Sequence, residues 1–111
     1  REPMANKPAR FYGPAQPGTV AATLVTAPSE QGIIIRNIHV ANTTATAATL
    51  TLSVGTDAVG TRLYATFSVP ANGIHDSGAT FEVLNGGETI QGFQGTSGAL
   101  TVSISGEVYS P

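Results

Sequence analysis

The chain has 111 residues, of which 41% are hydrophobic and only 11% are charged, and its formal net charge is −2. This length supports one domain with a packed core but not two. The basic residues form no stripe that could neutralise phosphates, which argues against nucleic acid as a partner. Cysteine is absent, which excludes disulfides and thiolate chemistry. No apolar run approaches the roughly 18 residues of a membrane span, and the N-terminus lacks the apolar core of a signal peptide, so we expect no membrane partner.

Residues 1–18 are predicted to form a proline-rich N-terminal arm. Its prolines argue against a helix and against a central strand, since proline fixes the backbone and lacks an N–H donor. Phe11 and Tyr12 would gain nothing in a solvated tail, so we expect the arm to dock, either on its own domain or on a neighbouring subunit. The three residues before Met4 are interpreted as an expression remnant or an upstream start, outside the fold.

Residues 19–111 are predicted to form one β domain. Short segments alternate apolar and polar residues with a period of two, the spacing of half-buried strands, and Gly, Asn, Asp and Pro separate them. A helix is poorly supported because β-branched residues and glycine are abundant and charged i,i+4 pairs are missing. The predicted strands cover residues 19–26, 33–42, 48–54, 62–69, 74–77, 80–84, 88–93 and 99–109.

About eight short strands at this spacing are typical of a sandwich or a barrel. We predict an all-β fold: a single-domain antiparallel β-sandwich over residues 19–111, with the extended arm at its N-terminus. Jelly-roll topology is favoured over an immunoglobulin-like one.

Strand phase predicts which side chains face the core. In the longest strand this phase carries Arg36 inward, where it would lie at the strand's end or pair with Glu82 or Asp76. The predicted inward sets are Val20, Ala22 and Leu24; Ile34, Ile38 and Val40; Leu50, Leu52 and Val54; Leu63, Ala65, Phe67 and Val69; Phe81 and Val83; and Leu100, Val102 and Ile104.

The two histidines are the first candidates for chemistry, because histidines near a carboxylate could bind a metal or share a proton. His39 lies in the longest strand, and His75 stands beside Asp76. Their spacing matches no ligand motif, and neighbouring residues of an extended segment point to opposite faces. We interpret both histidines as partly exposed polar residues.

Two further segments share only part of a binding-loop pattern. Asp57 stands between glycines, but a calcium site needs about six to eight oxygens, so we interpret Asp57 as a turn residue. Residues 92–98 lack the lysine and the helix of a phosphate loop, and Ser97 lacks the Gly-x-Ser-x-Gly frame of a hydrolase. We therefore expect no enzymatic activity, no catalytic residue, no metal, no cofactor and no small-molecule substrate.

Aromatic side chains are the remaining candidates. They could line a sugar-binding platform, but tryptophan, the usual residue of such platforms, is absent. Phe93 and Tyr64 fall opposite the apolar faces of their strands, so we expect both to be exposed, as aromatics of a protein interface are. The predicted interface residues are Lys7, Arg10, Phe11, Tyr12, Tyr64 and Phe93.

Five segments in series resemble small virion structural proteins of tailed bacteriophages, of the capsid-decoration or minor-capsid kind. The resemblance extends over roughly residues 19–108 and does not cover the arm. The segments are residues 34–42, 50–63, 69–73, 87–91 and 100–106.

This resemblance implies a β-rich module without an active site that binds the outside of the capsid and stabilises the head. Its partners would be the major capsid protein and further copies of itself, with a trimer favoured. Its location would be the capsid surface of the virion, after synthesis in the host cytoplasm. Two alternatives stay open: a tail, fibre or baseplate component that contacts a host receptor, and a carbohydrate-binding module.

Overall fold

The computed structural model describes residues 7–29, 31–77 and 82–109. These residues form nine strands and one short 3-10 turn, η1 (Val59–Thr61), so the all-β prediction is confirmed. The residues before Met4 and Phe81, about which the sequence made predictions, lie outside the described part. The strands are β1 (Lys7–Ala15), β2 (Ala22–Thr26), β3 (Gly32–Asn42), β4 (Ala48–Val54), β5 (Arg62–Val69), β6 (Ile74–Asp76), β7 (Glu82–Leu84), β8 (Thr89–Gln94) and β9 (Leu100–Tyr109).

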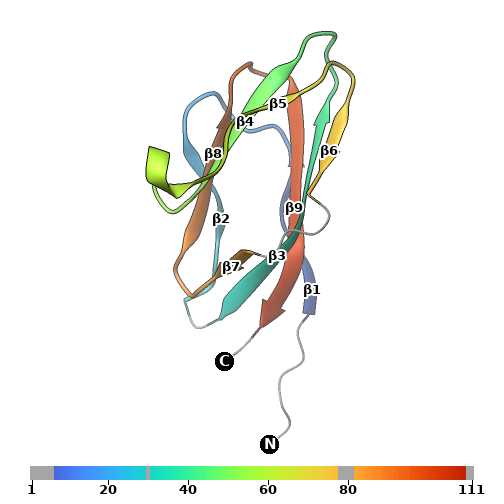
Figure 1. Cartoon of the computed structure of the whole chain (residues 1–111). Helices are drawn as coiled ribbons and strands as arrows, with labels where there is room; N and C mark the ends of the chain where they lie inside the picture. The colour runs from blue at the N-terminus through green and yellow to red at the C-terminus, as the bar shows by residue number, and fades with distance from the viewer. Residues whose placement is uncertain (1–6, 30, 78–81, 110–111) are drawn as a thin grey trace, which may run out of the picture.

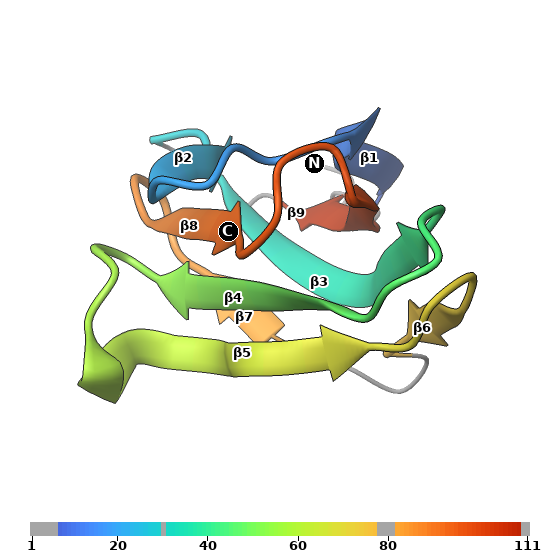
Figure 2. The ribbon, with the colours of Figure 1, turned by 90° about the horizontal axis from the view of Figure 1, so that it is seen from above.

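The strands form two antiparallel sheets that pack face to face, which is the predicted β-sandwich (Figures 1 and 2). Sheet A has the strand order β1-β9-β3-β6, and β7 pairs with another part of the same edge of β3. Sheet B has the order β2-β8-β4-β5. Most connections therefore cross from one sheet to the other.

The described part of the N-terminal arm is an edge strand of sheet A. Strand β1 pairs with β9, with Arg10 opposite Ser105 and Tyr12 opposite Ile104. Proline is tolerated in this strand because an edge strand leaves one row of N–H groups unpaired. Phe11 and Tyr12 pack against the core. Of the two predicted docking modes, the structure has the arm on its own domain.

The predicted phase of the longest strand is wrong in its first half. Strand β3 has an irregularity between Ile35 and Asn37, which inserts an extra residue and reverses the alternation. Ile33 and Ile35 are therefore buried and Ile34 faces outward, half-buried. Arg36 lies on the outside with its side chain 48% exposed, instead of pointing inward.

Similar irregularities make the predicted inward-facing residues of β2 and β5 partly wrong. Strand β2 begins after Val20, which is 77% exposed instead of facing the core, and a register shift lets Val25 be buried. In β5 a shift between the partners of Leu50 and Leu52 accommodates Thr66, whose φ is 48°. Tyr64 therefore packs against the core, contrary to the prediction that it is exposed.

The core lies between the sheets and is mainly aliphatic. Its buried polar residues are bonded: Gln94 accepts a hydrogen bond from the Leu100 N–H at 2.7 Å and donates one to the Pro17 carbonyl. This side chain ties the end of β8 to the start of β9 and to the link between β1 and β2. The buried hydrophobic residues are Val25, Ala27, Ile33, Ile35, Ile38, Val40, Ala48, Leu50, Leu52, Val69, Leu84, Ile90, Ala99, Leu100, Val102 and Ile104.

Candidate interaction surfaces

The aromatic residues near the edges of β5 and β6 close the seam between the two sheets. The ring centroid of His75 lies 4.5 Å from that of Phe67 and 5.6 Å from that of Tyr64. The Tyr64 hydroxyl lies 3.2 Å from His75 Nε2, and burial raises the pKa of Tyr64. These rings contact each other within the seam, so Tyr64 is half-buried and packs against the core.

His39 belongs to a separate polar cluster on the outer face of sheet A. His39 in β3 stands directly opposite Asp76 in β6, and its Nδ1 lies 2.7 Å from Asp76 Oδ1. Asn37 Nδ2 donates to the same carboxylate oxygen at 3.2 Å. The hydrogen bond from His39, followed by that from Asn37, lowers the pKa of Asp76. The prediction that His75 and Asp76 face opposite ways is confirmed, because one contacts the seam and the other this cluster.

The His39–Asp76 pair is a side-chain contact between β3 and β6. Among residues 7–29, 31–77 and 82–109, no group of three or more His, Asp or Glu side chains could hold a metal ion. Sequence reasoning missed the pair because the two residues are 37 positions apart. Only the pairing of β6 with β3 brings them together.

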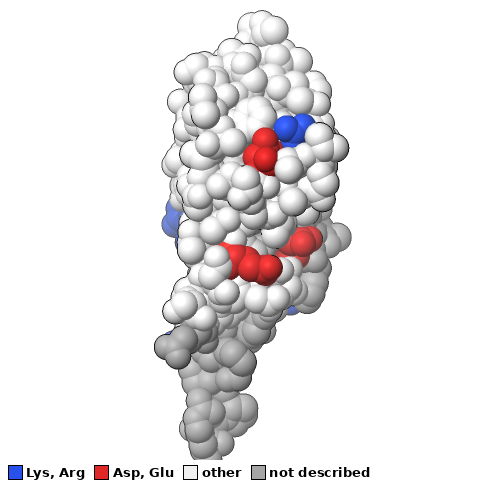
Figure 3. All heavy atoms as spheres, turned by 90° about the vertical axis from the view of Figure 1, so that its left-hand side faces the viewer, with Lys and Arg blue, Asp and Glu red and all other residues white. Residues whose placement is uncertain are grey.

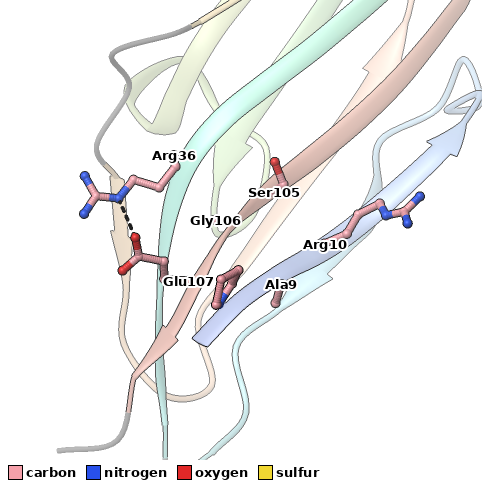
Figure 4. A pocket seen from close by; sticks show the side chains of 7 residues that line it. Ala9, Arg10, Arg36, Ser105, Gly106 and Glu107 are labelled. Atoms are coloured by element: carbon pink, nitrogen blue, oxygen red, sulfur yellow. Dashed lines mark ion pairs between the residues drawn. The ribbon is translucent and has the colours of Figure 1, made fainter. Parts of the chain in front are cut away.

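A shallow groove of about 440 Å³ lies on the outer face of sheet A, over β1, β9 and β3 (Figure 4). Gly106 lies in its floor. Arg36 and Arg10 lie on opposite sides of this floor and point away from each other. Arg36 Nε pairs with Glu107 Oε2 at 3.3 Å, a partner that the sequence did not suggest. The groove is further lined by Pro8, Ala9 and Ser105.

The outer face of sheet B carries a different kind of surface. Phe93 stands opposite Thr51, and Gln91 opposite Ser53. Phe93 and Gln91 are half-buried, whereas Thr51 and Ser53 are buried. Figure 3 views the molecule from the side of β2, β8 and η1 and shows a mostly uncharged surface there. Phe93 is half-buried on this face, in agreement with its predicted outward phase.

The charged pair of sheet B is neutralised locally. Arg62 donates through Nε to Asp57 Oδ1 at 3.1 Å and through Nη2 to Asp57 Oδ2 at 3.2 Å. Ser53 donates to Asp57 Oδ1 at 2.7 Å. The Arg62 hydrogen bonds, followed by the Ser53 bond, lower the pKa of Asp57. The carboxylate therefore holds the turn after β4, as expected of a turn residue.

Asp57→Asn is expected to destabilise the fold in a pH-dependent way. Because the folded-state pKa of Asp57 lies below its ordinary value of 3.8, the stabilisation is fully present above that value and is lost as the pH falls through the folded-state pKa. The difference in free energy of unfolding between wild type and variant should be largest near neutral pH and shrink in strong acid. Urea denaturation at neutral pH and in strong acid measures it. A difference that stays constant over this range contradicts the expectation.

The predicted interface residues thus divide into two groups. Lys7 and Arg10 are exposed on β1, and Phe93 lies on the outer face of sheet B. The others, Phe11, Tyr12 and Tyr64, pack against the core instead, and burial raises the pKa of Tyr12. The structure does not bring the six residues together into one surface.

No protein-family model, no curated protein and no solved structure matches the chain. Within the described residues, no helix has the length and apolar character needed to cross a membrane.

Proposed function

We propose that the chain is a non-enzymatic structural protein of a bacteriophage particle, which binds the outside of the capsid as a decoration or minor capsid protein. Its partners would be the major capsid protein and further copies of itself, and it would act on the virion surface after synthesis in the host cytoplasm. Binding the assembled shell and not its separate subunits stabilises the shell by mass action, and many copies together multiply a modest contact energy.

The observation that carries this proposal is the outer face of sheet B. This face is nearly free of unpaired charge and has an aromatic ring, Phe93, on one of its two central strands. Protein interfaces are depleted of charge at their centre and enriched in aromatic residues. The face is therefore suited to lie against another protein.

The strand order gives a second line of support. Strands β6 and β7 occupy one edge of β3, and when they are counted as one interrupted strand, the sheets read 1-8-3-6 and 2-7-4-5. This order supports jelly-roll topology, a two-sheet fold frequent in viral capsid proteins and also in lectins. Because a fold hosts many functions, the topology supports the proposal without deciding it.

Phe93→Glu is expected to weaken capsid binding at least about tenfold, because it places a charge at the centre of the proposed contact. The measurement is cosedimentation of the purified protein with capsids that lack it. Val20→Glu, at a site 77% exposed just before β2, is the control and should bind like wild type. Equal binding by both variants and wild type would remove sheet B from the interface.

The copy number of the chain in purified virions tests the proposed location. Quantitative mass spectrometry should find it in numbers comparable with the major capsid protein, and electron microscopy should place its density on the head. A few copies per particle, with density on the tail, would favour the tail or fibre alternative. Specific retention on a glycan array without capsid binding would favour a carbohydrate-binding module.

A further inference from the structure

We propose that the outer face of sheet A is a self-association surface, on which a second copy of the chain packs about a two-fold axis. The axis would run along the strands between β9 and β3. This pairing differs from the trimer that the phage resemblance implies. It requires no capsid, so it stands or fails independently of the proposed function.

The edges of the sheets offer poor sites for adding a strand from another copy. Strand β1 carries Pro8 and Pro14 and two register irregularities, and β5 contains the residue Thr66 with a positive φ. Strands β6 and β7 have only three residues each, and β2 has five with one irregularity. Short strands, bulges and prolines all hinder edge-to-edge pairing. A second copy is therefore expected to use a face.

Exposed apolar side chains favour the outer face of sheet A. Ile74 in β6 is 65% exposed and stands opposite Ala41, and Val83 in β7 is 38% exposed and stands opposite Ile34. In β3 the residues on either side of Ala41 and of Ile34 are buried in the core, so Ala41 and Ile34 point outward. Paired residues share a face, and Ile74 and Val83 therefore lie on the outer face of sheet A. They account for two of the four exposed large hydrophobic residues in the described chain.

The outer face of sheet A carries a positive charge at one edge and a negative charge at the other, so that two copies of the face can complement each other. Arg10 lies on β1 at one edge and forms no ion pair with any residue that the structure describes, whereas Asp76 lies on β6 at the opposite edge. Arg10 stands opposite Ser105, which in turn stands opposite Asn37. The hydrogen bond from Asn37 to Asp76 brings the carboxylate to the level of Arg10 along the strands.

A two-fold axis along the strands places β1 of one copy over β6 of the other. Each Arg10 then faces the partner's Asp76, and the contact occurs twice, as an isologous interface requires. Two strands, β9 and β3, lie between β1 and β6. Strand β9 presents the small side chains of Thr101, Ser103 and Ser105, which allow close approach of the two sheets along that part of the face. Glu107 of β9 and Arg36 of β3 lie further along the same face. The Arg36–Glu107 pair is neutralised within one copy.

The size of the face predicts a weak dimer. A strand of ten residues extends roughly 33 Å, and four neighbouring strands extend about 14 Å between the outermost axes, which gives on the order of 500 Å² per copy. The total of about 1,000 Å² is near the lower limit of specific interfaces. We therefore expect a reversible dimer whose population rises with concentration.

Charge exchange tests the pairing in the full chain by sedimentation velocity over a range of concentrations. Arg10→Glu and Asp76→Arg should each raise the dimer dissociation constant at least about tenfold, because each places like charges opposite one another. The double variant should return to within about threefold of wild type, since the exchanged charges again attract.

Ile74→Glu is a second variant that leaves the charged residues unchanged, and it should also abolish the dimer. Its matched control is Val59→Glu, at a site 87% exposed in η1 on the other side of the molecule, which should dimerise like wild type. Circular dichroism confirms that each variant is folded. A wild-type chain that is monomeric at all concentrations overturns the proposal. So does a double variant that is no better than the single ones, or an oligomer that Ile74→Glu does not affect.

Discussion

Gly106→Ala is expected to lower the free energy of unfolding by about 3 kcal/mol or more, because the site has no space for a Cβ atom. Gly106 lies in β9 between Ala9 of β1 and Ile35 of β3. An added Cβ would lie 2.9 Å from the Arg36 nitrogen and closer still to the carbonyl oxygen of Ile34. Both obstacles are backbone atoms, so relief requires the two central strands of sheet A to move apart.

Gly60→Ala is the matched control for this substitution. An added Cβ at Gly60 would meet no atom within 4 Å, and the expected change is within about 0.5 kcal/mol. Urea denaturation followed by circular dichroism measures both variants. If the two variants unfold at the same urea concentration, the backbone of β3 at Ile34 and Arg36 does not lie in close contact with Gly106 of β9.

Asn42→Asp is expected to lower the free energy of unfolding by about 3 kcal/mol near neutral pH. Asn42 is 3% exposed, and its amide donates to the carbonyls of Thr46 and Val69 at 2.9 and 3.1 Å. Its carbonyl accepts from the N–H and the hydroxyl of Thr44. Aspartate has the same shape but no N–H, so it would place a buried negative charge against two carbonyl oxygens.

The same chemical change at an exposed asparagine provides the control. Asn72 is exposed in the turn before β6 with a φ of 54°, a conformation that aspartate also tolerates, so Asn72→Asp should change stability by less than about 0.5 kcal/mol. Thermal denaturation distinguishes the two variants. The Asn42→Asp penalty should also decrease in acid, where a protonated carboxyl regains one donor. Equal melting temperatures would show that the amide donors of Asn42 contribute little.

The strands β2 to β9 could be predicted from the sequence because their apolar alternation is local, whereas β1 lies in the proline-rich arm, where no strand was predicted. Their phase could not always be predicted, since an irregularity in a strand leaves no periodic mark. In β3 the extra residue near Arg36 turns Ile33 and Ile35 inward, and the chain can adopt it because Gly106 on β9 leaves room. That dependence joins residues 70 positions apart, and alternation within one strand cannot reveal it.

The sequence could predict the direction of a surface side chain only where the alternation within one strand determines it. The outward position of Phe93 follows from the uninterrupted alternation of β8. Tyr64 was misplaced because β5 contains a bulge near Thr66. The contact of His39 with Asp76 depends on strand pairing, which periodicity within a strand does not specify.

The first described strand and the last one are neighbours, since β9 lies between β1 and β3 in sheet A. During synthesis on the ribosome, β1 is made first and must wait for its partner until almost the whole described chain has emerged. Pairing between distant segments closes slowly. A fragment that stops before residue 100 would therefore leave β1 with no strand to pair with in its own sheet.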